Sequence, residues 1–188
     1  RLLVQESIAD KLYRKIRRRM EKLRVGNALD KGIDVGAIVA PVQLKTIEDL
    51  VQKGVEEGGE LFQPSWDCPD EGCFYPPTLF TNVAPSSLIA QEEIFGPVVT
   101  LQPFDTEEEA AALSNNTLYG LGVSVFTSSM DRANRLIPKL NDGASIVNLA
   151  SLAGFGWPDA VAARPKSAVS SAERAAPGGA APRPGSAT

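Results

Sequence analysis

The sequence predicts an α/β fold whose layers surround a mostly parallel sheet. Short apolar runs rich in β-branched residues alternate with longer segments in which apolar residues recur every three or four positions, as strands and helices do in such folds. The length of 188 residues and the 43 % hydrophobic content are sufficient for one packed core. No apolar run approaches the ~18 residues of a membrane-spanning helix, so we expect no such helix.

The first part of the chain predicts one strand and two helices. Residues 2–4 form a buried strand, and Ser7 is placed to cap a helix that ends near Gly26. A second helix begins at about Pro41, a favoured residue of a first helical turn, and stops at Gly58-Gly59. The apolar stripes of the two helices consist of Ile8, Leu12, Ile16, Met20 and Leu23, and of Leu44, Ile47, Val51 and Val55.

The remainder of the chain alternates strands with helices. Thr106 and Glu109 have the spacing of a capping box, which predicts a helix over 107–115. Another helix is expected over 130–140, with a kink or an early end because Pro138 lies inside it. Further strands are expected at 60–63, 78–81, 97–101, 121–127 and 144–149, with a proline-rich loop over 64–77.

The composition changes near Pro158. Residues 159–188 consist mainly of Ala, Pro, Gly and Ser, contain no aromatic residue, and have Val161 and Val169 as their only large aliphatic residues. Such a segment buries too little apolar surface to offset the ~1–2 kcal/mol per residue lost when the backbone is ordered. We therefore expect a folded domain over 1–158 and a disordered tail over 159–188.

Missing residue types exclude several kinds of site. The chain has no histidine and only two cysteines, Cys68 and Cys73, so a Ser-His or Cys-His nucleophilic site and a tetrahedral Cys/His zinc site are excluded. We expect no metal and two free thiols. The neighbouring carboxylates of Asp67, Asp70 and Glu71 should raise the pKa of these thiols by charge repulsion, which argues against a catalytic role for either cysteine.

Charge is unevenly distributed along the chain. The net charge of −4 argues against nucleic acid as the main partner, yet the first helix is strongly basic. Its basic face could contact anionic lipid or nucleic acid, or it could simply be solvated. The narrow aliphatic stripe favours a solvated face, so we expect no nucleic-acid partner and no membrane partner. The basic residues are Lys11, Arg14, Lys15, Arg17, Arg18, Arg19, Lys22 and Arg24.

The beginning of the chain leads to two further expectations. Arg1 opens directly on a strand-like run and no methionine precedes it, which suggests a fragment of a longer protein. The first residues also lack the basic segment followed by an apolar segment that marks a secretory signal. We therefore expect a cytoplasmic protein.

Several sequence elements follow one another in the order found in one known family. They are residues 1–8 (RLLVQESI), 72–79 (GCFYPPTL), 92–99 (EEIFGPVV), 115–127 (NNTLYGLGVSVFT) and 143–148 (GASIVN). Together they resemble the NAD(P)-dependent aldehyde dehydrogenase superfamily over about residues 1–149. The resemblance implies the layered, mostly parallel sheet of that family's catalytic domain. The domain is expected to be incomplete, because the family elements that follow the position of Asn148 are not recognisable here.

The resemblance implies a cofactor, NAD or NADP, and roles for three residues. Glu93 would accept hydrogen bonds from ribose hydroxyls, Phe95 would pack near the nicotinamide, and Gln43 would contact the cofactor from the opposite side. The residues alone leave another interpretation open. In that interpretation Glu92 and Glu93 are a solvated pair, Phe95 belongs to the core, and Gln43 is an ordinary exposed side chain.

The resemblance also implies oxidation of an aldehyde by a nucleophilic cysteine, with a carboxylate base and an asparagine that stabilises the oxyanion. All three match positions before Arg1, so we expect no catalytic residue in this chain. The chain would be a piece of such an enzyme, inactive alone, with its parent chain or a homo-oligomer as partner. The alternative is a non-catalytic module that acts through binding or assembly. Exposed strand edges predict poor solubility in either case.

Overall fold

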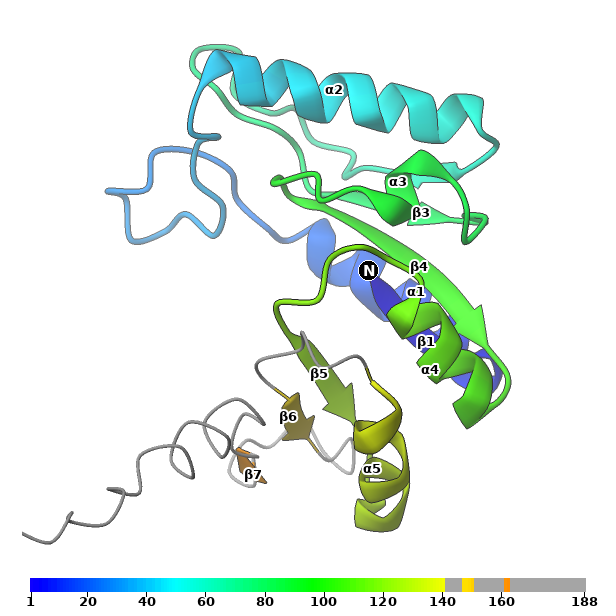
Figure 1. Ribbon diagram of the computed structural model, residues 1–188. Helices are drawn as coiled ribbons and strands as arrows, with labels where there is room; N and C mark the ends of the chain where they lie inside the picture. The colour runs from blue at the N-terminus through cyan, green and yellow to red at the C-terminus, as the bar shows by residue number, and fades with distance from the viewer. Residues whose placement is uncertain (141–146, 151–160, 163–188) are drawn as a thin grey trace, which may run out of the picture. The chain divides into compact units, whose positions relative to one another are not determined.

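The computed structural model describes residues 1–140, 147–150 and 161–162. The chain divides into two compact units, Arg1–Tyr119 and Gly120–Thr188, and Figure 1 shows the elements of each. The predicted α/β class is confirmed, because helices and strands alternate through both units. The described part of the chain contains no helix that combines the length and the apolar character needed to cross a membrane.

A four-stranded sheet organises the first unit. Its strands lie in the order β1 (Leu2–Gln5), β4 (Val98–Phe104), β3 (Thr78–Thr81) and β2 (Glu60–Phe62). β4 is parallel to both β1 and β3, and only the edge strand β2 runs antiparallel. The prediction of a mostly parallel sheet is therefore confirmed.

Helix α1 (Glu6–Met20) covers one face of this sheet, and Figure 1 shows it behind β1 and β4. The helix ends earlier than predicted, at Met20 and not near Gly26. It also begins earlier, with Gln5 at the N-cap and no side-chain cap, so the predicted cap at Ser7 is wrong. Four residues of the predicted apolar stripe pack on the sheet, whereas the fifth, Ile8, is exposed. The cluster consists of Val4, Met20, Leu79 and Leu101, with Leu2, Ala9, Leu12, Tyr13, Ile16, Leu23, Phe62 and Val99 around them.

The opposite face of the sheet is covered by α2 (Pro41–Glu56) and the short α3 (Leu88–Gln91). Leu79 belongs to the α1 cluster and Phe80 to the α2 cluster, because successive strand residues point to opposite faces. The prediction of α2 from Pro41 is confirmed, whereas α3 was not predicted. The α2 cluster consists of Ile47, Val51, Tyr75, Phe80, Ile89 and Ile94, with Ile38, Leu44, Leu50, Val83 and Val98 around them.

Helix α4 (Glu107–Asn115) contacts β1 and β4. The Thr106 hydroxyl accepts a hydrogen bond from the Glu109 backbone N–H at 3.1 Å. The Glu109 carboxylate in turn accepts one from the Asp105 backbone N–H at 2.7 Å. The predicted capping box is confirmed, except that the carboxylate reaches one residue further back than the usual pattern.

The second unit is smaller in its described part. β5 (Val123–Phe126) pairs in parallel with β6 (Val147–Ala150), which pairs antiparallel with β7 (Val161–Ala162). Helix α5 (Met130–Leu136) gives way to the 3₁₀ turn η1 (Ile137–Lys139) at Pro138, so the predicted early end is confirmed. Residues 144–146 of the last predicted strand lie outside the described residues. Apart from β7, so does the segment 159–188, and its expected disorder stays a prediction.

Candidate functional site

The turn between α3 and β4, residues 92–97, brings together the three residues that the sequence singled out. Glu93 and Phe95 lie on the turn, and Gln43 lies in the first turn of α2. The Gln43 side-chain amide Nε2 donates a hydrogen bond to the backbone carbonyl of Ile94 at 2.8 Å. Because Ile94 separates Glu93 from Phe95, this bond fixes the middle of the turn against α2.

Close packing against α2 also holds the same turn. Ile94 is buried in the α2 cluster, and a Cβ atom added to Gly96 would lie only 2.6 Å from Ile47 Cδ1. A larger residue could therefore not approach α2 so closely. The backbone N–H of Thr78 donates to the carbonyl of Pro97 at 2.8 Å, which leads the turn directly into the pairing of β3 with β4.

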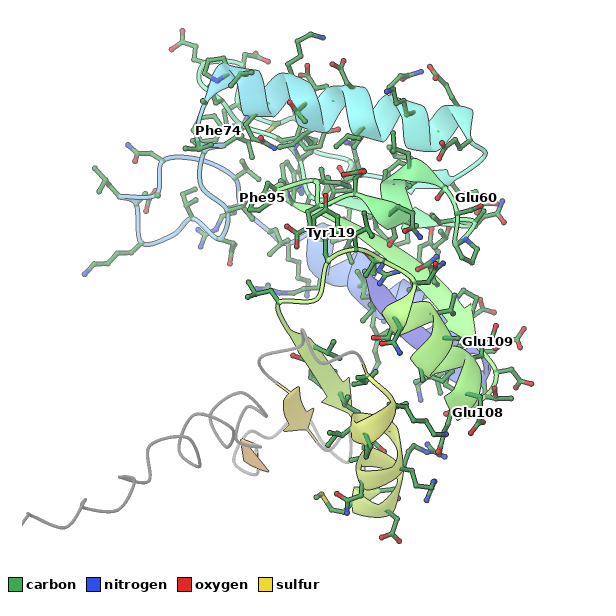
Figure 2. The ribbon with its side chains drawn as sticks, in the orientation of Figure 1. Glu60, Phe74, Phe95, Glu108, Glu109 and Tyr119 are labelled. Carbon is green, nitrogen blue, oxygen red and sulfur yellow. The ribbon has the colours of Figure 1, made fainter. Side chains whose placement is uncertain are left out.

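Phe95 is held in an unfavourable conformation and points outward. Its φ is +51°, in the left-handed region that bulky residues rarely adopt. Its side chain is 76 % exposed within the described part of the chain, so the interpretation of Phe95 as a core residue is wrong here. Figure 2 labels Phe95 on this turn. Glu93 is exposed as well, so the turn presents a carboxylate and an aromatic ring away from the core.

Tyr119 reaches the same turn from the segment after α4 and is also labelled in Figure 2. Its hydroxyl donates a hydrogen bond to the Glu92 carboxylate at 2.9 Å. This bond to Glu92 raises the pKa of Tyr119, with smaller contributions from desolvation and from the Glu92 charge, while a backbone hydrogen bond with Glu93 acts in the opposite direction. Glu92 is therefore not simply a solvated neighbour of Glu93, since it ties the turn to residue 119.

The segment before Tyr119 is itself anchored at two points. The Arg1 guanidinium donates to the carbonyls of Ser114 at 3.0 Å and Asn116 at 3.2 Å, where a cation complements the carboxyl end of helix α4. The Gln91 side-chain amide also donates to the Asn116 carbonyl, at 3.0 Å. The family resemblance included residues 115–121. The hydrogen bonds that join the end of α4 to Arg1 and to Gln91 were not predicted.

The two cysteines are free thiols, and both are partly buried. Burial raises the pKa of the Cys68 thiol, and the charge of Asp70 raises it further. The predicted upward shift is thus confirmed for Cys68, although burial contributes more than the neighbouring carboxylate. Among the described residues, His, Cys, Asp and Glu side chains form no group of three or more that could hold a metal ion.

Comparison with known proteins identifies one family. The model of the aldehyde dehydrogenase family matches residues 1–155. The chain is 34 % identical over 152 residues to a betaine aldehyde dehydrogenase from Cereibacter sphaeroides, an alignment that covers 81 % of this chain and 32 % of that protein. It is 40 % identical over 148 residues to the cytosolic aldehyde dehydrogenase 1 of Rattus norvegicus, covering 79 % of this chain and 30 % of the relative.

Solved structures agree with this result. Betaine aldehyde dehydrogenase from Staphylococcus aureus, in complex with NAD+, superimposes with a TM-score of 0.74 at 34 % identity, covering 81 % of this chain and 31 % of that one. An NAD-dependent aldehyde dehydrogenase from Sinorhizobium meliloti gives a TM-score of 0.74 at 30 % identity, covering 87 % and 32 %. The chain therefore spans about a third of the length of the relatives it matches.

Proposed function

Because the chain belongs to the aldehyde dehydrogenase family, we propose that the turn at residues 92–97 forms part of an NAD or NADP site in an aldehyde-oxidising enzyme. The observation that carries this proposal is the outward presentation of Glu93 and Phe95 by a turn that three contacts fix: the bond from Gln43, the packing of Gly96 on Ile47, and the bond from Tyr119. A turn with a fixed backbone suits a cofactor site, because little ordering of the backbone remains to be done on binding.

The residues present are suited to such a cofactor. The exposed Glu93 carboxylate can accept hydrogen bonds from two ribose hydroxyls, and the exposed Phe95 ring offers an apolar surface for the nicotinamide. When bound, the nicotinamide would accept a hydride from the aldehyde carbon. Gln43 donates its amide N–H to Ile94, so we assign it a positioning role on the turn, with its amide oxygen left for a direct contact with the cofactor.

We further propose that the 188-residue chain alone does not oxidise aldehydes. The raised pKa of Cys68 lowers its thiolate fraction at neutral pH and makes it a poor nucleophile. The catalytic groups and the rest of the cofactor site would come from the parent chain, and a homo-oligomer is the other partner that the resemblance implies. The same proposal includes a catalytic-domain portion over 1–158, a disordered tail over 159–188 and a cytoplasmic location.

Saturation-transfer NMR with NAD+ and NADP+ tests the site separately from catalysis. We expect weak transfer to the ribose and nicotinamide protons, reduced several-fold by Glu93→Gln and by Phe95→Ala. Glu71→Gln is the matched control, because Glu71 is also an exposed glutamate but lies outside the turn. Transfer that survives both turn variants, or that falls equally in Glu71→Gln, would contradict the proposed site.

A second measurement addresses activity. The chain is incubated with NAD+ or NADP+ and acetaldehyde, and the reduced cofactor is measured by its absorbance. We expect none to form, and its formation by the isolated chain would contradict the proposed lack of activity. The non-catalytic module is the second candidate function. It would be supported if a longer parent chain also binds the cofactor without reducing it.

A further inference from the structure

The outward face of α1 carries a row of basic side chains that the proposed function does not use. The row, named here the cationic stripe, consists of Lys11, Arg14, Lys15 and Arg18 on α1 and of Lys22 in the turn that follows Met20. Residues three, four and seven positions apart lie on one side of a helix, and all five side chains are exposed. The apolar stripe of α1 faces the sheet, so the cationic stripe faces solvent.

Several charged residues beside the stripe have partners of their own, whereas Asp10 is an exposed carboxylate on α1 itself. Arg19 and Arg24 lie within 3.6 Å and 4.0 Å of the Asp34 carboxylate. Glu21 accepts two hydrogen bonds from Ser65, one from the backbone N–H at 3.1 Å and one from the hydroxyl at 2.9 Å. The nearby carboxylates of Asp34 and Glu21 are thus directed toward other groups.

The cationic stripe itself retains most of its charge for a partner. Lys11, Arg14, Arg18 and Lys22 form no ion pair within the ranges that the structure describes. Arg17, which lies beside the stripe, stacks at 4.1 Å over the ring of Phe62 and at 5.4 Å over that of Tyr13. This stacking leaves both rings beneath a guanidinium, so they are poorly placed to stack with a base.

We propose that the cationic stripe binds the phosphate backbone of single-stranded nucleic acid without sequence preference, in place of the solvated face expected from the sequence. At a rise of 1.5 Å per residue, Lys11 to Arg18 span about 10 Å of α1, with roughly two cations per turn. A narrow row of this kind can contact a single line of phosphates through charge alone, without the aromatic stacking that other single-strand sites add. The net charge of −4 means that the attraction is local to this face and not a property of the whole chain.

A membrane surface is the less suitable partner. Peripheral membrane helices insert apolar or aromatic side chains beside their basic residues, whereas the apolar side chains of α1 pack mostly against the sheet. Ile8 is the exposed large apolar residue of the helix, at 40 %, and it precedes the stripe. The row therefore offers charge for phosphate but almost no apolar surface for insertion.

The test is fluorescence anisotropy of the full 188-residue chain with a labelled thymidine oligonucleotide of about 16 nucleotides, measured over a series of salt concentrations. Four phosphate contacts, from Lys11, Arg14, Arg18 and Lys22, predict a slope of about −2.8 for log K against log salt, since each contact contributes about −0.7 for single strands. The variant Lys11→Glu, Arg18→Glu, Lys22→Glu should lower the slope by about 2 and the affinity about 100-fold at ~0.1 M salt.

The matched control is Lys31→Glu, Lys45→Glu, Lys53→Glu, which changes the net charge equally at exposed positions outside α1. It should retain most of the affinity. Circular dichroism checks the fold of both variants, and the corresponding glutamine substitutions replace any variant that does not fold. The proposal is overturned by equal losses in stripe and control variants, by binding to phosphatidylserine vesicles but not to the oligonucleotide, or by the absence of salt-dependent binding.

Discussion

The two faces of the four-stranded sheet are covered by helices of similar length that differ in how they relate to the candidate site. On the α2 face, two glycines permit close approach: a Cβ on Gly54 would lie 2.6 Å from Ile89 Cδ1, and one on Gly96 equally close to Ile47 Cδ1. On the α1 face, the contact is an aliphatic cluster and the outer side carries cations. The α2 face thus fixes a turn through close contacts at glycines, whereas the α1 face is held by an aliphatic cluster alone.

The largest expected effect on stability comes from truncating Ile47, which packs against Gly96 of the turn. Ile47 is fully buried, and Ile47→Ala should lower the free energy of unfolding by about 2–5 kcal/mol, because it removes buried methylene groups and leaves a cavity. Urea denaturation measures this loss. Hydrogen exchange of the amides in residues 92–97 should also accelerate, since local opening of the turn becomes easier.

The α1 face supplies the control. Leu101 is 4 % exposed and belongs to the α1 cluster, so Leu101→Ala should destabilise the fold by a comparable amount while leaving the local protection of residues 92–97 unchanged. Equal acceleration of exchange in both variants would show that the two faces do not differ in how they hold the turn.

Gly96 gives the next effect in size. Gly96→Ala places a Cβ against Ile47 Cδ1, and the overpacking should cost about 1–3 kcal/mol. The additional substitution Ile47→Val removes that methyl group, so the double variant should recover part of the loss in urea denaturation. Strictly additive effects of the two substitutions would contradict a steric contact between these residues. Gly36→Ala is a milder control, because its nearest neighbour is Ala28 Cβ at 3.3 Å.

The sequence predicted the elements that periodicity marks and missed those that depend on contacts between distant residues. The end of α1 was placed too late because Leu23 continues the apolar spacing and does pack in the α1 cluster, although the helix has already ended at Met20. Helix α3 has only four residues, Leu88–Gln91, which is too short for a helical period to be visible.

The candidate site shows the same limit. Glu93, Phe95 and Gln43 were found through a family resemblance, but the partner of Gln43 is a backbone carbonyl, which carries no sequence signal. The bond between Tyr119 and Glu92 joins residues 27 positions apart, so spacing could not reveal it. The residues alone did not predict the exposure of Phe95, because an aromatic residue next to a large apolar one usually indicates a core, and only the resemblance implied an accessible ring.

A smaller effect is expected at Gln43. Gln43→Leu keeps the size of the side chain but removes the hydrogen bond to the Ile94 carbonyl, which should lower the free energy of unfolding by about 1 kcal/mol. Exchange in residues 92–97 should rise more than exchange in the α1 cluster. Gln52→Leu is the control, since Gln52 bonds only to Glu56 on the exposed side of the same helix. Equal changes in the exchange of residues 92–97 in the two variants would contradict the positioning role proposed for Gln43.

The smallest effect concerns the pKa of Tyr119. The bond to Glu92 raises this pKa above its ordinary value of about 10. The contribution of the bond to folding stability is therefore present below pH ~10 and is lost as the pH rises through the folded-state pKa. The difference between ultraviolet titrations of the native chain and Tyr119→Phe isolates this phenol. Glu92→Gln should lower its midpoint toward ~10, because the charged acceptor is gone. An unchanged midpoint in Glu92→Gln would mean that Glu92 does not hold Tyr119 in solution, and the turn would then depend on α2 alone.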